Sequence, residues 1–232
     1  MDLRNLNAMI KILRDYYRTF RKPSVTQISQ RFKDPFHVLI SCVLSQRTKD
    51  QTTAEASQRL FSLAPSLMRL AQLPVKKIER AIYPVGFYRT KAKTIKLAAN
   101  DIMMRFQGIV PDDLDCLLSL KGVGRKTANL VLTLGFNKLG ICVDTHVHRI
   151  SNRFGFVVTK TPHDTEMALR KTLPKKFWIG GLQTGNRDMV LDKNLKINLA
   201  KLKDLRYGEN PHQASAFYVE DGNSGFEQLW GI

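Results

Sequence analysis

The chain has 232 residues, 43% of them apolar and 9% aromatic. That is enough hydrophobic material for a packed core, so a disordered chain is excluded. No apolar run reaches the ~20 residues of a membrane-spanning helix. The formal net charge is +17, with 37 basic against 20 acidic residues. Such a charge favours a polyanionic partner, above all nucleic acid.

The positive charge is concentrated in the first 180 residues. Six basic and seven acidic side chains follow Gly180, so the part up to that residue carries +18. The later part is also richer in Gly and Asn, which is typical of turns. We therefore predict a change of character near Gly180–Gly181 and place the polyanion-binding face before it.

Up to that point the spacing of apolar residues predicts helices throughout. The chain opens with an amphipathic helix over about 3–17, and PFHVLISCVLSQ, from Pro35, predicts a buried helix with proline in its first turn. The alternation typical of β-strands is absent from the sequence before residue 180, so we predict an all-α fold. Further helices are predicted over 50–63, 75–82, 90–106, 112–119, 126–136, 145–154 and from Pro162 onwards.

A glycine turn between two predicted helices carries the strongest functional signal. Gly122 and Gly124 flank Val123 and allow a tight turn with exposed backbone. The free N–H groups and the positive dipole end of the following helix suit a phosphate, and Lys121 and Arg125 add charge. A bare Gly-x-Gly is more often an ordinary connection between helices, but the charged flanks and the basic body favour phosphate binding here.

Lys126 lies in the first turn of the helix that follows. The helix dipole and the neighbouring Lys121 and Arg125 disfavour an ammonium there. A neutral amine that attacks C1′ of a sugar is therefore one interpretation, and a further phosphate contact is the other. Asp144 opens the next predicted helix, where Asp is a favoured N-cap. If it also faces Lys126, it can accept the proton and stabilise an oxocarbenium-like centre.

Two histidines follow in the segment VDTHVHR. His146 and His148 are two positions apart, so they face different directions on a helix, and no further metal ligand is suitably spaced. We predict no metal site. Surface or packing roles are expected for both, with His146 counted among the residues near phosphate.

The segment LKGVGRKTANLVL, followed by VDTHVHRISNRFG, resembles the helix-hairpin-helix DNA glycosylases and, within them, the endonuclease III family. The resemblance spans about residues 1–179 and includes PFHVLISCVLSQRTKD and VGFYRTKAKTI. It implies a bifunctional base-excision repair enzyme that removes oxidised pyrimidines and cleaves the abasic site by β-elimination through a lysine Schiff base. The implied partner is double-stranded DNA with a damaged base or an abasic site. We expect a monomer in the cytoplasm, at the nucleoid and not in a membrane.

The resemblance also implies roles for single residues. Lys126 becomes the Schiff-base nucleophile and Asp144 its acidic partner. Gln46 becomes the residue inserted where the flipped base was stacked, with a plain surface role as the alternative. Phe87 becomes a wedge against the opposite strand, with a core position as the alternative. The residues expected to contact DNA are Gln46, Phe87, Lys121, Gly122, Val123, Gly124, Arg125 and His146.

The sequence departs from that family in its cysteines. The endonuclease III family closes with four clustered cysteines that hold a [4Fe–4S] cluster. Here Cys42, Cys116 and Cys142 lie far apart in apolar segments, where small buried thiols are the ordinary explanation. We predict no iron–sulfur cluster and no other cofactor.

The implied architecture is a six-helix barrel with a helix-hairpin-helix motif, over residues 22–136. An incomplete second helical domain is expected from 1–21 and 137–180, followed by a loop-rich tail over 181–232. Within the tail, about residues 190–232 resemble the bifunctional purine-biosynthesis enzyme with AICAR formyltransferase and IMP cyclohydrolase activities, most clearly in RYGENPHQ. Only the opening of the transferase domain is represented, so we expect no purine activity and favour a fusion or truncation artefact.

Three functions follow from these patterns. The first is an endonuclease III-like DNA glycosylase and AP lyase. The second is a truncated or fused helix-hairpin-helix DNA-binding protein without turnover. The third, a purine-biosynthesis fragment, is disfavoured by the charge of the first 180 residues. Borohydride trapping on an abasic-site duplex separates the first two.

Overall fold

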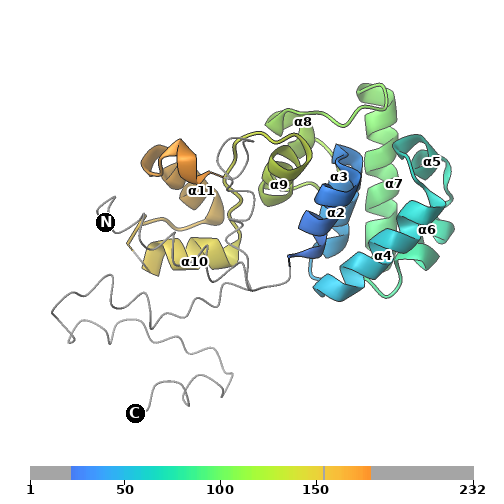
Figure 1. Ribbon diagram of the computed structural model, residues 1–232, viewed down its shortest axis with the longest axis horizontal. Helices are drawn as coiled ribbons and strands as arrows, with labels where there is room; N and C mark the ends of the chain where they lie inside the picture. The colour runs from blue at the N-terminus through green and yellow to red at the C-terminus, as the bar shows by residue number, and fades with distance from the viewer. Residues whose placement is uncertain (1–21, 154, 179–232) are drawn as a thin grey trace, which may run out of the picture. The chain divides into compact units, whose positions relative to one another are not determined.

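A computed structural model of the protein describes residues 22–153 and 155–178. The predicted opening helix and the tail lie outside the described residues. Every α-helix and 3-10 helix of the described part is drawn in Figure 1, and this part contains no β-strand, so the all-α prediction is confirmed. None of its helices is long and apolar enough to cross a bilayer.

The helices agree closely with the predicted ranges, and those over 50–63 and 75–82 agree to the residue. Two short helices, α2 and α5, were not predicted. Helix α2 has no side-chain cap at its start, and α5 has only six residues, too few for a periodic pattern. In chain order the elements are α2 (Ser24–Phe32), α3 (Pro35–Ser45), α4 (Asp50–Leu63), α5 (Leu67–Gln72), α6 (Val75–Ile82), α7 (Tyr88–Arg105), α8 (Leu114–Leu118), α9 (Arg125–Gly135), α10 (Thr145–Arg153), α11 (Pro162–Thr172) and the 3-10 helix η1 (Lys175–Phe177).

Helix α3 is the centre of the larger apolar core. All residues from Phe36 to Leu44 are buried, as the apolar run predicted. Pro35 occupies the first turn, and the Asp34 carboxylate caps the helix by accepting a hydrogen bond from the Phe36 N–H at 3.2 Å. Helix α3 contacts α2, α4, α7 and α9, and Figure 1 shows α9 on one side of it and α7 on the other. The start of α9 and the end of α3 are therefore held together by the core.

The described residues form two apolar clusters. The larger takes its side chains from Val25 to Leu132. The smaller lies between Ile141 and Trp178 and includes Val147 of α10 and Leu169 of α11. The predicted boundary between a barrel domain that ends at residue 136 and a second domain that begins at 137 stays a prediction, because the second domain also includes residues that are not described.

Candidate active site and nucleic-acid interface

The glycine turn lies between α8 and α9. Gly122 has a φ of +82°, and a Cβ there would lie 2.2 Å from Thr94 Cγ2 of α7. Val123 is buried and anchors the turn in the core. Gly124 has extended backbone, and a Cβ there would meet no atom within 4 Å. Gly122 is thus needed for the left-handed backbone and for the close contact with Thr94. At Gly124 the missing side chain leaves the backbone of the turn exposed.

The start of α9 presents unused backbone donors. No described side chain caps this helix, and its first intrahelical bond runs from the Ala128 N–H to the Gly124 carbonyl at 2.9 Å. The N–H groups before Ala128 therefore have no acceptor within the helix. Together with the positive end of the dipole, they suit a phosphate group.

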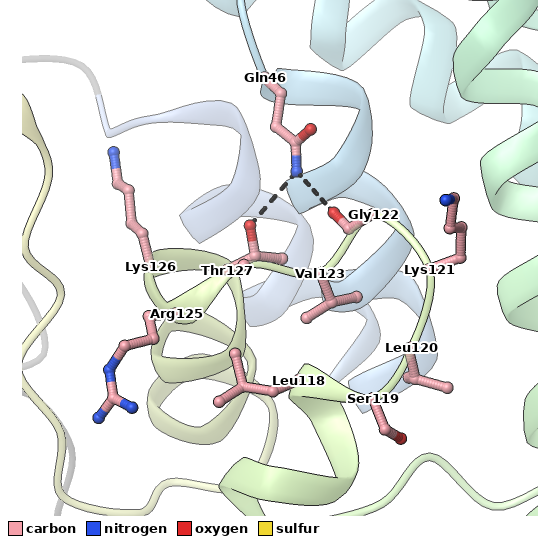
Figure 2. Close-up of a pocket in the computed structure, with 11 residues that line it drawn as sticks. Gln46, Leu118, Ser119, Leu120, Lys121, Gly122, Val123, Arg125, Lys126 and Thr127 are labelled. Carbon is pink, nitrogen blue, oxygen red and sulfur yellow. Dashed lines mark hydrogen bonds between the residues drawn. The ribbon is translucent and has the colours of Figure 1, made fainter. Parts of the chain in front are cut away.

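An open pocket of about 810 Å³ lies over this turn. Figure 2 shows the Gln46 amide above the turn, with Lys126 and Arg125 on one side and Lys121 on the other. The pocket thus brings together residues from the end of α3 and from the hairpin. Its lining consists of Gln46, Leu118, Ser119, Leu120, Lys121, Gly122, Val123, Gly124, Arg125, Lys126 and Thr127.

Lys126 and Asp144 form an ion pair at the edge of this pocket. Lys126 Nζ donates to Asp144 Oδ2 at 2.8 Å, and the two side chains are 47% and 14% exposed. The other carboxylate oxygen, Oδ1, accepts hydrogen bonds from the backbone N–H groups of His146 at 3.0 Å and Val147 at 2.9 Å. The predicted N-cap is therefore present, and the two side chains converge as the interpretation required.

The environment of Asp144 favours its ionised form. Burial by itself raises the pKa of this carboxyl, but the hydrogen bonds from Lys126 and from the Val147 N–H outweigh it and hold the pKa below its usual value. A carboxylate fixed by a helix N-terminus and facing an amine can accept a proton or stabilise a cation formed beside it.

Arg125 has a different environment from the one expected. Its guanidinium donates to Glu166 of α11 through Nε at 2.9 Å and Nη2 at 3.2 Å. Glu166 is 3% exposed and also accepts from Arg170 Nε at 2.9 Å and from Asn129 Nδ2 at 3.1 Å. The Arg125 side chain thus joins α9 to α11 through Glu166.

The charge state of Glu166 follows from these contacts. Burial raises its pKa, but the hydrogen bonds from Arg125, Arg170 and Asn129 outweigh burial, so the pKa lies below its usual value. Sequence reasoning did not single out this residue. The only local signal is the spacing of Glu166 and Arg170 four positions apart, which is common on exposed helix faces.

Gln46 lies at the C-terminal end of α3 and is exposed. Its side-chain Nε2 donates to the Gly122 carbonyl at 3.2 Å and to Thr127 Oγ1 at 3.4 Å, as drawn in Figure 2. Phe87 is 64% exposed, so the alternative of a core aromatic does not hold. It lies on a turn next to that of Gln46, since a Cβ on Gly86 would be 2.6 Å from the Arg47 carbonyl oxygen.

The two histidines separate as their spacing predicted. The His148 ring packs between α10 and α11, with Nδ1 2.6 Å from Thr165 Oγ1. His146 is exposed beside the N-cap of α10. No group of three His, Cys, Asp or Glu side chains in the described ranges could hold a metal ion.

The cysteines do not fit the iron–sulfur cluster of the endonuclease III family. A [4Fe–4S] cluster needs four thiolate ligands, and the chain contains three cysteines. Cys42 and Cys142 are buried, and burial raises the pKa of the Cys142 thiol to about 12. The absence of any cofactor stays a prediction.

An all-helical body with a Gly-x-Gly hairpin and a Lys–Asp pair beside it defines the class of helix-hairpin-helix DNA repair glycosylases. The chain belongs to the HhH-GPD superfamily of base excision DNA repair proteins, whose family model matches residues 40–175. The predicted fold and base-excision repair class are thereby confirmed.

Individual relatives agree with this assignment. Endonuclease III of Thermotoga maritima is 50% identical over 145 residues, which cover 62% of this chain and 68% of the relative. A solved structure of a trapped covalent intermediate of endonuclease III with DNA, in an estranged-adenine complex, is 37% identical with a TM-score of 0.60 and the same two coverages. A thermostable thymine-DNA glycosylase structure shares the fold, with a TM-score of 0.66 at 20% identity over 86% of this chain and 95% of the other.

The second resemblance is found as well. Residues 168–232 match the family model of the AICARFT/IMPCHase bienzyme. Most of this segment lies outside the described residues.

Proposed function

We propose that the protein is a DNA N-glycosylase and AP lyase that acts on double-stranded DNA with an oxidised pyrimidine or an abasic site. The observation that carries the proposal is the ion pair between Lys126 and Asp144 at the edge of the hairpin pocket. An amine beside a fixed carboxylate, next to a phosphate-binding turn, is the arrangement that imine chemistry at a sugar C1′ needs.

The hairpin grips the DNA backbone in this proposal. The N–H groups at the start of α9 bind a phosphate, with Gly122, Val123 and Gly124 shaping the turn and Lys121 adding charge. Arg125 contributes its backbone N–H, because its side chain is bound to Glu166. These contacts read the backbone and not the base sequence.

The chemistry begins when the damaged nucleotide leaves the stack, since C1′ is otherwise shielded. Asp144 takes a proton from Lys126, and the free amine forms a bond to C1′ while the C1′–N bond breaks and the base leaves with the electron pair. The C1′–O4′ bond of the sugar then breaks, O4′ takes up the proton that the nitrogen gives up, and an imine between Lys126 and C1′ remains. Loss of a C2′ proton then expels the 3′ phosphate by β-elimination, and water finally releases the sugar aldehyde from the lysine.

Gln46 and Phe87 are both exposed, and the turns that carry them meet at Gly86 and Arg47. Gln46 would enter the gap left by the extruded base, and Phe87 would separate the opposite strand. His146, exposed beside the N-cap of α10, would contact a phosphate of the duplex. We propose that the protein works as a monomer, without a cofactor, in the cytoplasm at the nucleoid.

Borohydride trapping on a duplex with a single abasic site tests the proposal. The native protein should give a covalent adduct, and Lys126→Ala should give none. Lys138→Ala is the matched control, because Lys138 is 48% exposed and ion-paired with Asp112 at 2.7 Å but lies outside the pocket. Salt-sensitive binding by the native protein without any adduct would instead support a DNA-binding protein without turnover.

A further inference from the structure

Lys91 of α7 is a buried lysine without an acidic partner. The residue is 6% exposed, and no carboxylate of the described residues lies within ion-pair distance of its Nζ. Nζ donates instead to the Leu44 carbonyl at 2.7 Å, to the Gln46 carbonyl and to Thr48 Oγ1 at 2.9 Å. The three hydrogen bonds of Nζ therefore all go to the last turn of α3 and the residues directly after it.

A lysine in this position is costly for folding. Burial disfavours the ammonium and lowers the pKa of Lys91 to about 8. The negative end of the α3 dipole, with its free carbonyls, compensates in part. An apolar side chain would fill the same space without the desolvation penalty. The hydrogen bonds of the ammonium therefore have another effect, which is to fix the position of the groups that they bind.

The groups bound by the Lys91 ammonium belong to the turn after α3. Arg47 has a left-handed φ of 50°, which places the Gln46 carbonyl toward Lys91 and leaves the Gln46 side chain over the hairpin. Thr48 Oγ1 adds a bond to the same Gln46 carbonyl at 3.2 Å. Among the described residues, this hydroxyl would be the one donor left to the Gln46 carbonyl without the ammonium.

The same lysine lies one turn from the loop that carries Phe87. Its backbone N–H donates to the Phe87 carbonyl at 2.9 Å. Phe87 also has a left-handed φ, of 58°, and the Arg47 guanidinium lies 5.9 Å from its ring centre. Gly86 meets the Arg47 backbone so closely that a Cβ would be 2.6 Å from the carbonyl oxygen. Lys91 thus contacts both turns at the point where they meet.

We infer that Lys91 is a positioning residue that fixes the Gln46 turn against the Phe87 turn, so that both side chains enter the duplex as one unit. This inference rests on the proposed function, because it assigns Lys91 to the recognition of extruded DNA. Lys91 has no contact with Lys126 or Asp144 among its hydrogen bonds, so its role concerns DNA distortion and not the covalent step.

The test uses an abasic-site duplex with 2-aminopurine opposite the lesion, whose fluorescence rises when the base is unstacked. Compared with the native protein, Lys91→Met should lose most of the fluorescence increase and bind roughly tenfold more weakly, because the Leu44 and Gln46 carbonyls lose a donor and the Gln46 turn is no longer held in place. The rate of borohydride trapping at saturating DNA should fall no further than the fluorescence increase does, because only the extrusion step is impaired while the amine and the carboxylate are unchanged.

Lys96→Met is the matched control. Lys96 lies on the same helix and donates to the Ala71 carbonyl at the end of α5, away from both turns. It should lower thermal stability as Lys91→Met does and leave fluorescence and affinity unchanged. A double variant with Gln46→Ala adds a second criterion: Lys91→Met should weaken binding less in that background than in the native protein, because part of its effect passes through the Gln46 side chain.

Thr48→Val removes one hydrogen-bond partner of Lys91 and replaces Lys91→Met as the test variant if Lys91→Met does not fold. It should reduce the fluorescence increase and weaken binding by about threefold. Native-like fluorescence and affinity in the folded Lys91→Met, or in Thr48→Val where that variant stands in, would overturn the inference while trapping by the native protein upholds the proposed function. Fully additive effects of Lys91→Met and Gln46→Ala would overturn it as well. If the native protein neither traps nor unstacks, both the proposed function and the inference are wrong.

Discussion

Lys126 Nζ lies 2.8 Å from Asp144 Oδ2, although the two residues are 18 positions apart, one in the first turn of α9 and the other at the N-cap of α10. The other oxygen of the carboxylate is bound to the start of α10. The helix N-terminus therefore holds the carboxylate in place, and the amine meets a rigid partner. One oxygen of Asp144 thus caps a helix and the other faces the amine, so the structural and the chemical role of this side chain can be tested separately.

Asp144→Asn should show that separation. The amide oxygen can still accept the N–H groups of α10, so the melting temperature should change by only a few degrees, but the negative charge beside Lys126 is lost. We expect the trapping rate to fall by about 10²–10⁴-fold, the range for a lost acid–base group. Asp144→Ala removes the cap as well and should cost about 1 kcal/mol more in stability. Native-like trapping by Asp144→Asn would contradict the role of the carboxylate.

The two glycines of the hairpin should respond differently to alanine. Gly122→Ala forces a side chain into a φ of +82° and against Thr94, so we expect a loss of about 1–3 kcal/mol in urea unfolding. Gly124→Ala meets open space in extended backbone and should change stability by less than about 0.5 kcal/mol. Its methyl group would project at the bare surface near the phosphate, so abasic DNA should bind more weakly. Equal stability losses in the two variants would contradict this reading of the turn.

The salt dependence of DNA binding should report the phosphate contacts. Each phosphate neutralised by Lys or Arg adds about 0.9 to the slope of log affinity against log salt concentration. Lys121→Ala removes an exposed charge beside the hairpin and should lower that slope by about 1. Lys76→Ala, an 81% exposed lysine on α6 outside the pocket, should leave the slope unchanged. A reduction caused by Lys76→Ala alone would place the DNA on another face.

Local patterns predicted most helices and part of the site, for physical reasons that individual residues illustrate. The apolar run after Pro35 predicts a buried helix because apolar side chains are buried whichever residues they pack against. Asp144 was found because N-capping is a local preference that two backbone hydrogen bonds satisfy. Lys91 and Glu166 were missed because their partners lie 47 and 41 positions away. Nothing in their immediate sequence distinguishes them from surface charges.

Glu166 offers a prediction about acid stability. Glu166→Gln leaves Arg125 and Arg170 without a counter-charge in a site where the carboxylate is 3% exposed, so we expect a loss of about 3 kcal/mol at neutral pH. The pKa of Glu166 is lowered in the folded protein, so its stabilising effect is present above the usual value of 4.5 and is lost as pH falls through the folded pKa. Urea unfolding between pH 7 and 3 should therefore show the advantage of the native protein over Glu166→Gln shrinking progressively as the pH falls below 4.5. Glu79→Gln, which breaks a pair with an 81% exposed lysine, should cost about 1 kcal/mol or less. A difference between native and Glu166→Gln that stays constant down to pH 3 would mean that the buried carboxylate does not stabilise the fold through its charge.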